Sequence, residues 1–237
     1  MEIIPINPIK KASLNRRILD KAISESDEDR VYFHDEQDKL FEVITKHLAE
    51  DDYEKKADLY AILLDFVIGV RISELVALKY SDISYRFNTI YVCRKKNKDQ
   101  SISDHTKGYE KRHLDLSDYA LQLIDAVKEA TKDFLSTEDY IFVNAEGRRH
   151  IRGLDNTLRL LCNEAGIPEK SFHDIKRTVA SELHEQGMTL EDIRGVMGHK
   201  DIATTQCYIY SRNRRTDTAI AIHKAIKGNE ANIFKAS

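Results

Sequence analysis

Residues 173–210 read HDIKRTVASELHEQGMTLEDIRGVMGHKDIATTQCYIY and hold much of the polar chemistry of the chain. The stretch contains two prominent histidines, a Lys-Arg pair and two tyrosines, within a pattern that otherwise indicates tightly packed helices. These polar groups recur at intervals too wide for a single helix face. We interpret the stretch as most of an active site, with Arg71, far upstream, as the arginine that completes it.

The remaining sequence predicts an α+β fold that is mainly α, a helical domain with a small antiparallel β-sheet. Strands are predicted where β-branched and aromatic residues alternate, at NTIYVCR (88–94), KRHLDLS (111–117) and YIFV (140–143). Helices are predicted where apolar residues recur at helical spacing. These helices begin at His34, after the acidic loop DDYEKKAD (51–58), at ISELVALKY (72–80), after the N-cap Ser117, at Leu154, near His173 and after the cap Thr189.

The composition excludes several classes of protein. The length of 237 residues suits one large domain, or one domain plus a fragment, and the 41% of hydrophobic residues allow a sizeable core. No apolar run approaches the roughly 18 residues of a membrane span, and the N-terminus lacks the apolar centre of a signal peptide. Three isolated cysteines and the absence of CxxC or HExxH spacing predict a reducing compartment and no metal site. We expect a cytoplasmic protein.

Charge is unevenly distributed along the chain. The formal net charge of −3 argues weakly against a nucleic-acid partner, but basic residues gather in short runs at 10–17, 94–98, 107–113, 148–152 and 212–215. Such runs can form a basic face on an acidic protein, although each can also be ordinary solvated surface.

Arg71 is predicted at a helix start, where backbone N–H groups favour an anion. Glu74, one turn later, can orient its guanidinium. The alternative is an ordinary surface pair at i, i+3.

Four motifs occur in a particular order: GVRISEL (69–75), HDIKRT (173–178), MGH (197–199) and TTQCY (204–208). Together they resemble the tyrosine recombinase (phage integrase) family over roughly residues 34–225. That family has an R-x-x-E helix, a hairpin lysine, H-x-x-R, GH and TTxxY in this order. The resemblance implies a site-specific recombinase or integrase that cuts and rejoins DNA through a 3′-phosphotyrosine intermediate, with no cofactor.

The resemblance assigns roles to the motif residues. Tyr208 is the expected nucleophile, with Tyr210 as its alternative, and His173 is a plausible base. A phenol has an ordinary pKa of about 10 and needs help to lose its proton. Arg71, His173, Lys176 and His199 are expected to bind the charge on the phosphate oxygens. The expected general acid is Lys107 on the hairpin; Lys95 and Lys96 remain its rivals.

Lys176 departs from the family pattern, which has an arginine three residues after the histidine. An ammonium is a point charge, whereas a guanidinium grips two phosphate oxygens as a planar fork. Three interpretations are open: a natural variant, a deliberate substitution that slows the enzyme, or compensation by the adjacent Arg177. Glu74 and Arg177 are therefore expected to support the site.

The resemblance also predicts the domain organisation. Residues 1–30 are expected to be a linker or arm, the remnant of a missing N-terminal core-binding domain, and residues 31–212 the catalytic domain. Residues 213–237 are expected to form a tail helix that docks on a neighbouring subunit, or packs on its own domain.

Double-stranded DNA is the expected partner, bound by a homotetramer that exchanges its C-terminal tails. The nine expected DNA-binding residues are basic and lie in the runs described above: Lys95, Lys96, Lys98, Lys111, Arg112, Arg148, Arg149, Arg152 and Arg212. Two alternatives to a recombinase remain: a catalytically weakened DNA-binding protein of the same fold, and an enzyme like a type IB topoisomerase.

Overall fold

The structure of the protein is a computed structural model, which describes residues 30–50, 53–104, 111–134, 139–144, 147–148, 151–210 and 212. The expectations for the N-terminal arm and the tail helix lie outside these residues, as do Lys107 and Arg149. Within the described residues, no helix combines the length and apolar character that crossing a membrane requires.

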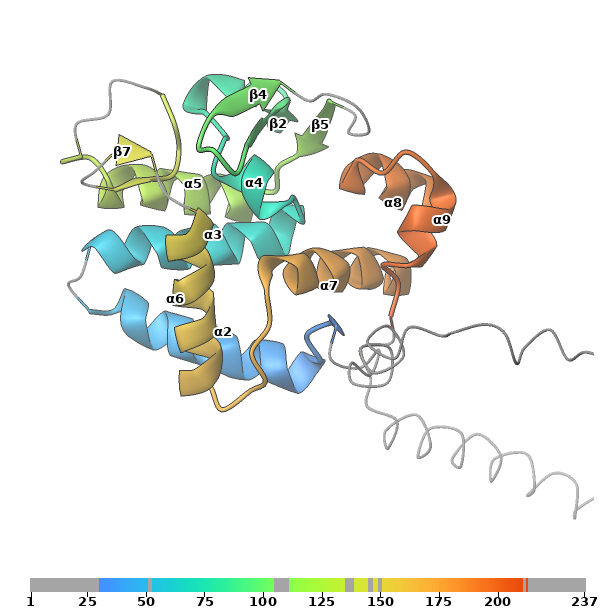
Figure 1. The fold of residues 1–237 in the computed structure, drawn as a ribbon, viewed down its shortest axis with the longest axis horizontal. Helices are drawn as coiled ribbons and strands as arrows, with labels where there is room; N and C mark the ends of the chain where they lie inside the picture. Colours follow the sequence, from blue (N-terminus) through green and yellow to red (C-terminus); the bar gives the residue numbers. More distant parts are fainter. Residues whose placement is uncertain are drawn as a thin grey trace, which may run out of the picture.

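A central helix, α3 (Tyr53–Ile68), organises the domain (Figure 1). It packs against α5 (Asp118–Ala130) on one side and α7 (Phe172–Glu185) on another. The helices α2 (His34–Leu48) and α6 (Ile151–Glu164) pack against each other and against α3. Ile62 and Leu64 lie on nearly opposite sides of α3, and both are fully buried, because other helices cover α3 on more than one side. The mainly helical fold predicted from the sequence is therefore confirmed.

Short antiparallel strands lie beside the one-turn helix α4 (Ile72–Leu75), which β3 (Arg94–Lys96) contacts (Figure 1). Strand β2 (Thr89–Val92) lies between β1 (Ile83–Ser84) and β5 (Arg112–Asp115), and Ile90 faces Leu114 across the ladder. Two separate antiparallel pairs accompany this sheet. Strand β3 pairs with β4 (Ile102–Asp104), between β2 and β5 in the chain. Strand β6 (Val143–Asn144) pairs with β7 (Gly147–Arg148), after α5 in the chain. The predicted antiparallel pairing of the two main strands is correct.

Several helix boundaries follow the local capping chemistry. The Ser117 hydroxyl accepts a hydrogen bond from the backbone of Ala120 at the start of α5. The Thr189 hydroxyl does the same for Asp192 at the start of α8 (Leu190–Met197). Gly198 ends α8 in the left-handed conformation, with φ of 63°. A short helix, α9 (Ile202–Gln206), then leads to Tyr208.

Three predicted boundaries are wrong. The acidic segment 51–58 is not all loop, because α3 begins at Tyr53. Helix α4 (Ile72–Leu75) is a single turn rather than a helix over 72–80, since Lys79 bridges to Tyr140 and a 3₁₀ turn, η3 (Tyr80–Asp82), follows. The strand predicted at 140–143 is also shorter in the structure. Tyr140 forms only the isolated bridge to Lys79, and Val143 is the one residue of the predicted segment that belongs to a strand, β6.

Candidate active site

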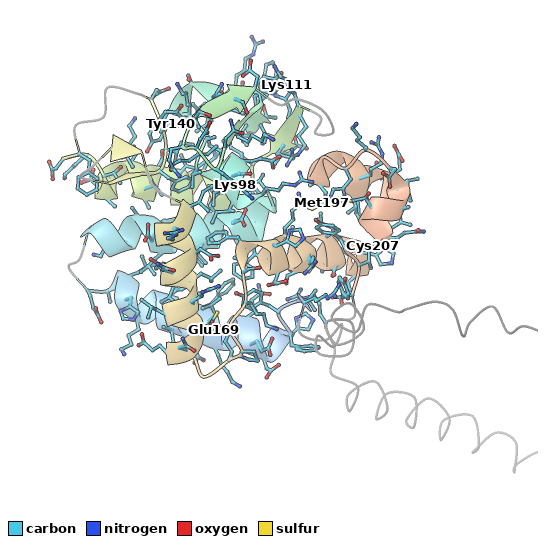
Figure 2. The ribbon with its side chains drawn as sticks, viewed as in Figure 1. Lys98, Lys111, Tyr140, Glu169, Met197 and Cys207 are labelled. Atoms are coloured by element: carbon cyan, nitrogen blue, oxygen red, sulfur yellow. The ribbon has the colours of Figure 1, made fainter. Side chains whose placement is uncertain are left out.

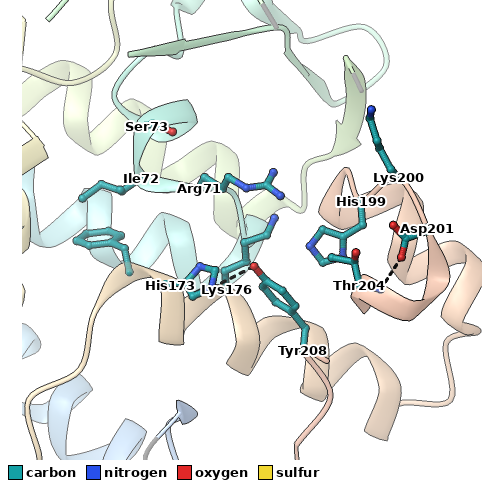
Figure 3. A pocket seen from close by; sticks show the side chains of 11 residues that line it. Arg71, Ile72, Ser73, His173, Lys176, His199, Lys200, Asp201, Thr204 and Tyr208 are labelled. Carbon is teal, nitrogen blue, oxygen red and sulfur yellow. Dashed lines mark hydrogen bonds between the residues drawn. The ribbon is translucent and has the colours of Figure 1, made fainter. Parts of the chain in front are cut away.

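A cavity of about 580 Å³ opens where α4, α7, α8 and α9 meet. Helix α7 supplies its floor, and the turn after α8 closes one side (Figures 1 and 3). Most of the residues that the sequence motifs single out face this space. Its lining consists of Arg71, Ile72, Ser73, Phe172, His173, Lys176, His199, Lys200, Asp201, Thr204 and Tyr208.

Tyr208 projects its phenol into the cavity (Figure 3). Its Oη lies 3.1 Å from Nε2 of His173, and the rings of His173 and Tyr208 meet edge to face at 5.1 Å. The backbone around the phenol is held from α7, where the Ser181 hydroxyl accepts from the N–H of Tyr210 and shares its one hydrogen between the carbonyls of Arg177 at 2.8 Å and Tyr208 at 3.2 Å. Tyr210 is absent from the cavity lining, so the geometry favours Tyr208 as the nucleophile.

His199 lies on the other side of the same phenol, with the two ring centroids 4.5 Å apart. Its Nδ1 is 3.0 Å from the hydroxyl of Thr205. Its Nε2 is buried and has no hydrogen-bond partner among the residues that the structure describes. When the Thr205 hydroxyl donates to Nδ1, the neutral His199 ring carries its proton on Nε2. This Nε2–H can then donate to an anion.

Arg71 is held in place by a buried carboxylate. Oε1 of Glu74 accepts from the Arg71 guanidinium at 3.3 Å, and Oε2 accepts from the Arg71 backbone at 3.1 Å. Glu74 is only 1% exposed and also pairs with Arg112 at 3.0 Å, which rules out an ordinary surface pair. Burial by itself raises the pKa of Glu74, but the charge and hydrogen bond of Arg112 outweigh it and lower the pKa to about 2.

Arg112 fastens the sheet to this site. Its Nε donates to the carbonyl of Val196 at 2.7 Å, one turn before His199 in the chain. A Cβ on Gly198 would lie 2.6 Å from Nη1 of Arg112, so the chain must have glycine there to approach so closely. The same guanidinium therefore fixes both Glu74 and the α8 turn.

Lys176 and Arg177 point in different directions from α7. Lys176 is fully buried, lines the cavity and donates to the carbonyls of Gly69 and Met197. Arg177 pairs with Asp174 and lies 5.7 Å from the ring centroid of Tyr208, outside the cavity lining. This geometry gives no support to the interpretation that Arg177 replaces the missing arginine at a phosphate.

The site is electrostatically positive. Burial, followed by the charge of Arg177, lowers the pKa of His173 to about 4. One edge of this ring faces solvent, so water screens part of the charge effect. Burial and the charges of Lys176 and Arg71 lower the pKa of His199 to about 3. Both imidazoles are therefore neutral at pH 7, and His173 can accept a proton.

Three of the expected DNA contacts are wrong, because they are buried in protein contacts or in the sheet. Arg212 is 2% exposed and binds the carbonyl of Tyr32 and the side chains of Gln37 and Glu182. Arg112 is engaged as described, and Lys96 is 3% exposed. Three other candidates, Lys98, Lys111 and Arg152, are exposed, and Lys95 is half-buried. Figure 2 labels Lys98 and Lys111. Arg148 lies in β7, and the structure does not describe its side chain.

Several residues of the site were not predicted. Thr205 and Ser181 hold His199 and the backbone of Tyr208, and Lys200 lines the cavity. The position of Lys200, directly after the Gly-His pair, was the one local signal that could have indicated it. In the described part of the chain, no group of three or more His, Cys, Asp or Glu side chains is placed to hold a metal ion.

Comparison with known structures places the fold among DNA recombinases. XerA recombinase superposes with a TM-score of 0.63 and 24% identity, over 81% of this chain and 65% of that one. The Tn1549 transposon integrase in complex with transposon right end DNA gives a TM-score of 0.65 and 19% identity, over 88% and 70%. XerH bound to its difH substrate gives 0.61 and 19%, over 81% and 54%.

The sequence agrees with the fold. Residues 9–215 match the model of the phage integrase family, and the chain belongs to that family. It is also similar to tyrosine recombinase XerC of Staphylococcus aureus (strain USA300 / TCH1516), with 27% identity over 187 residues, or 78% of this chain. The chain spans 58% of the length of that relative.

Proposed function

We propose that this chain is the catalytic domain of a site-specific DNA recombinase or integrase, which cuts and rejoins DNA strands through a 3′-phosphotyrosine. The single observation that carries the proposal is the 3.1 Å contact between Tyr208 Oη and His173 Nε2, inside a cavity that Arg71, Lys176 and His199 also line. A nucleophile, a neutral proton acceptor and fixed positive charge are what a phosphodiester transfer requires.

In this mechanism, Oη of Tyr208 attacks the phosphorus of a DNA phosphodiester and passes its proton to Nε2 of His173. The new O–P bond forms as the bond from phosphorus to the 5′-oxygen breaks. Lys107, which lies outside the described residues, remains our proposed donor of the proton that the 5′-oxygen takes. The 5′-hydroxyl of a second strand then attacks the phosphotyrosine and releases Tyr208, so no external energy source is needed.

The oxygens of the phosphate gain charge during this transfer. Arg71 and His199 both line the cavity, and the guanidinium of Arg71 and the buried, unpartnered Nε2 of His199, when it carries the proton, would bind that charge. Lys176 contributes positive charge and the one N–H that its two backbone bonds leave over. These donors are preorganised, since Glu74 fixes Arg71 and Thr205 fixes His199.

The wider DNA contact and the assembly are part of the same proposal. Lys95, Lys98, Lys111 and Arg152 remain candidate contacts to the DNA backbone, together with Arg148 and Arg149 from the sequence. We retain the expectations of an N-terminal linker, a tetramer on DNA and a C-terminal tail that docks on a neighbouring subunit. We also retain a cytoplasmic location on the nucleoid.

The test is covalent capture. The protein first selects its preferred sequence from a pool of random duplexes, and a nicked duplex of that sequence then serves as the substrate. We expect a protein–DNA adduct that survives denaturation and is lost in Tyr208→Phe, while Tyr210→Phe, two residues away, still forms it. No adduct from the selected duplex, or an adduct that persists in Tyr208→Phe, would contradict the proposal.

A second candidate function is a catalytically weakened DNA-binding protein, and the buried bonding of Lys176 is the observation that favours it. Such a protein would bind the selected duplex and form no adduct. An enzyme like a type IB topoisomerase would form the adduct and also relax supercoiled plasmid as a monomer, which a gel assay on plasmid lacking the selected site detects.

A further inference from the structure

Arg212 is a buried arginine four residues after Tyr208 in the chain. Its Nε donates to the carbonyl of Tyr32 at 3.2 Å, and its Nη1 donates to Oε2 of Glu182 at 2.9 Å. Its Nη2 donates to the side-chain oxygen of Gln37. A guanidinium suits this arrangement, because its planar fork directs several N–H donors at once, whereas a lysine has a single point of charge. These donors are used inside the domain.

The three partners of Arg212 belong to a well-fixed corner of the domain. Tyr32 lies directly before α2, Gln37 lies in the first turns of α2, and Glu182 lies in α7. Tyr32 is fully buried, and its N–H donates to the Thr178 hydroxyl of α7 at 2.8 Å. The segment after α9 runs past the end of α7 toward this corner (Figure 1). Arg212 therefore fastens that segment to both α2 and α7.

The chain after Tyr208 is anchored to α7 at two successive points. The N–H of Tyr210 donates to the Ser181 hydroxyl at 2.9 Å, and Arg212 pairs with Glu182 two residues further on. Ser181 and Glu182 are neighbours in α7. Both anchors thus draw the segment that follows the phenol against the same helix.

That helix also carries the residue that the phenol of Tyr208 must reach. Oη of Tyr208 lies 3.1 Å from Nε2 of His173, in the first turn of α7. A displacement of about 1 Å at such a contact can cost about 10²-fold in rate. Because Arg212 holds the segment after Tyr208 to α7, it controls this distance without touching the reacting groups.

We propose that Arg212 is a positioning residue of the active site that acts through Tyr208. Its guanidinium clamps the segment after the nucleophile to α2 and α7, and the clamp keeps the phenol at His173 of the same chain. The inference rests on the proposed function for its consequence in catalysis. The clamp itself is a property of the folded chain, so it can be tested without DNA.

The first test is ¹⁹F NMR on protein in which the tyrosines are replaced by 3-fluorotyrosine. The signal of Tyr208 is identified by its loss in Tyr208→Phe. The signal of Tyr140, a buried tyrosine between α5 and β6, is identified by its loss in Tyr140→Phe. In the wild type, the imidazole rings on both sides of Tyr208 should hold its signal away from that of free fluorotyrosine.

We expect Arg212→Met to move the Tyr208 signal toward that of free fluorotyrosine and to leave the Tyr140 signal in place. This pattern would be specific to the nucleophile segment. An unchanged Tyr208 signal would overturn the proposal. Movement of both signals together would show a general structural role and would overturn it as well.

Lys170→Met is the matched control, because Lys170 is a buried cation that holds the entry to α2. Its Nζ donates to the carbonyl of Val31 at 2.7 Å and pairs with Glu36 at 3.1 Å. Removal of either cation breaks an ion pair, so both variants should melt at a lower temperature than the wild type. Lys170→Met should nevertheless keep the wild-type Tyr208 signal. If it moves that signal as far as Arg212→Met does, the position of Tyr208 depends on this corner in general and the proposal fails.

The catalytic consequence is measured as the rate of adduct formation, at a temperature where both variants are folded. Arg212→Met should slow the reaction by about 10²-fold with unchanged affinity for the selected duplex. Arg212→Lys can still pair with Glu182 and should recover part of the rate, and Lys170→Met should keep the wild-type rate. A loss of affinity as large as the loss of rate would make Arg212 a DNA contact and overturn the proposal. If the wild type forms no adduct, the proposed function fails, while the ¹⁹F signals still decide the clamp.

Substitutions of the partners cover the case in which Arg212→Met does not fold. Gln37 and Glu182 are half-buried, so Gln37→Ala combined with Glu182→Ala should be tolerated. The double variant removes two of the three bonds described for Arg212 and keeps the arginine. It should move the Tyr208 signal in the same direction and slow adduct formation, with the Tyr140 signal in place. A wild-type Tyr208 signal and a wild-type rate in this variant would overturn the proposal.

Discussion

Nη2 of Arg112 lies 3.0 Å from Oε2 of Glu74, and this buried pair joins the sheet to the helix turn that carries Arg71. The pair is nearly free of solvent, so neither charge can be hydrated if the other is removed. Arg112 therefore serves the interior of the domain, although it lies in a basic run of the sequence.

Arg112→Gln should lower the free energy of unfolding by about 3–5 kcal/mol, because Glu74 would remain buried without its partner. The neighbouring Lys111 is exposed and provides the matched control. Lys111→Gln should change stability by about 0.5 kcal/mol or less. Urea unfolding followed by circular dichroism measures both, and a small loss in Arg112→Gln would show that the pair contributes little.

His173 should be active as a proton acceptor well below neutral pH. Its pKa of about 4 leaves the ring neutral through the mildly acidic range, so protonation at His173 should not slow adduct formation between about pH 5.5 and 7.5. With the ordinary histidine pKa of about 6.5, the ring would instead become mostly protonated as the pH falls from 7.5 to 5.5, and the rate of adduct formation would drop accordingly.

The rate of adduct formation across this range, in single-turnover assays, checks the prediction. His173→Gln should slow the reaction by about 10²–10⁴-fold. His184→Gln changes an exposed histidine of the same helix and should leave the rate and its pH profile unchanged. A midpoint near pH 6.5 that disappears in His173→Gln would show that the ring is not held neutral.

The parts of the fold that local chemistry determines could be predicted from the sequence. The caps Ser117 and Thr189 each depend on a few neighbouring residues, and both were predicted. Burial of a charged side chain has no such local signal. Asp65 lies among the apolar residues of α3, yet it is fully buried and its Oδ1 accepts from the N–H of Val70, in the turn before Arg71.

The errors among the basic residues have the same origin. Arg112 and Arg212 each belong to a run that reads as solvated surface, yet their partners Glu74 and Glu182 are distant in the chain. The same limit applies to Lys176: its motif position was evident, but its two carbonyl partners come from other turns. Long-range contacts decide whether such cations face DNA or the interior.

Gly198→Ala should disturb the site through both backbone and side-chain strain. Gly198 has φ of 63°, and an added Cβ would lie 2.6 Å from Nη1 of Arg112. We expect a loss of about 1–3 kcal/mol in stability and a slower adduct, because Arg112 and the adjacent His199 must shift.

Gly195→Ala is the matched control, three residues earlier in α8, where an added Cβ meets nothing within 4 Å. It should be neutral or stabilising by about 0.5–1 kcal/mol, since alanine favours the helix. Thermal melting distinguishes the two variants, and equal effects at both positions would argue against a special requirement at Gly198.

Lys176→Arg tests what the departure from the family pattern does to the reaction. An arginine at this position has five N–H donors, so it can keep the two backbone bonds and still present donors to the phosphate. We expect adduct formation to accelerate by about tenfold, because the guanidinium presents additional donors to the phosphate. Arg177→Gln serves as the comparison, because Arg177 is bonded to Asp174 outside the cavity lining. Arg177→Gln should keep most of the wild-type rate of adduct formation. If Lys176→Arg instead has the wild-type rate and Arg177→Gln forms no adduct, Arg177 and not Lys176 binds the phosphate.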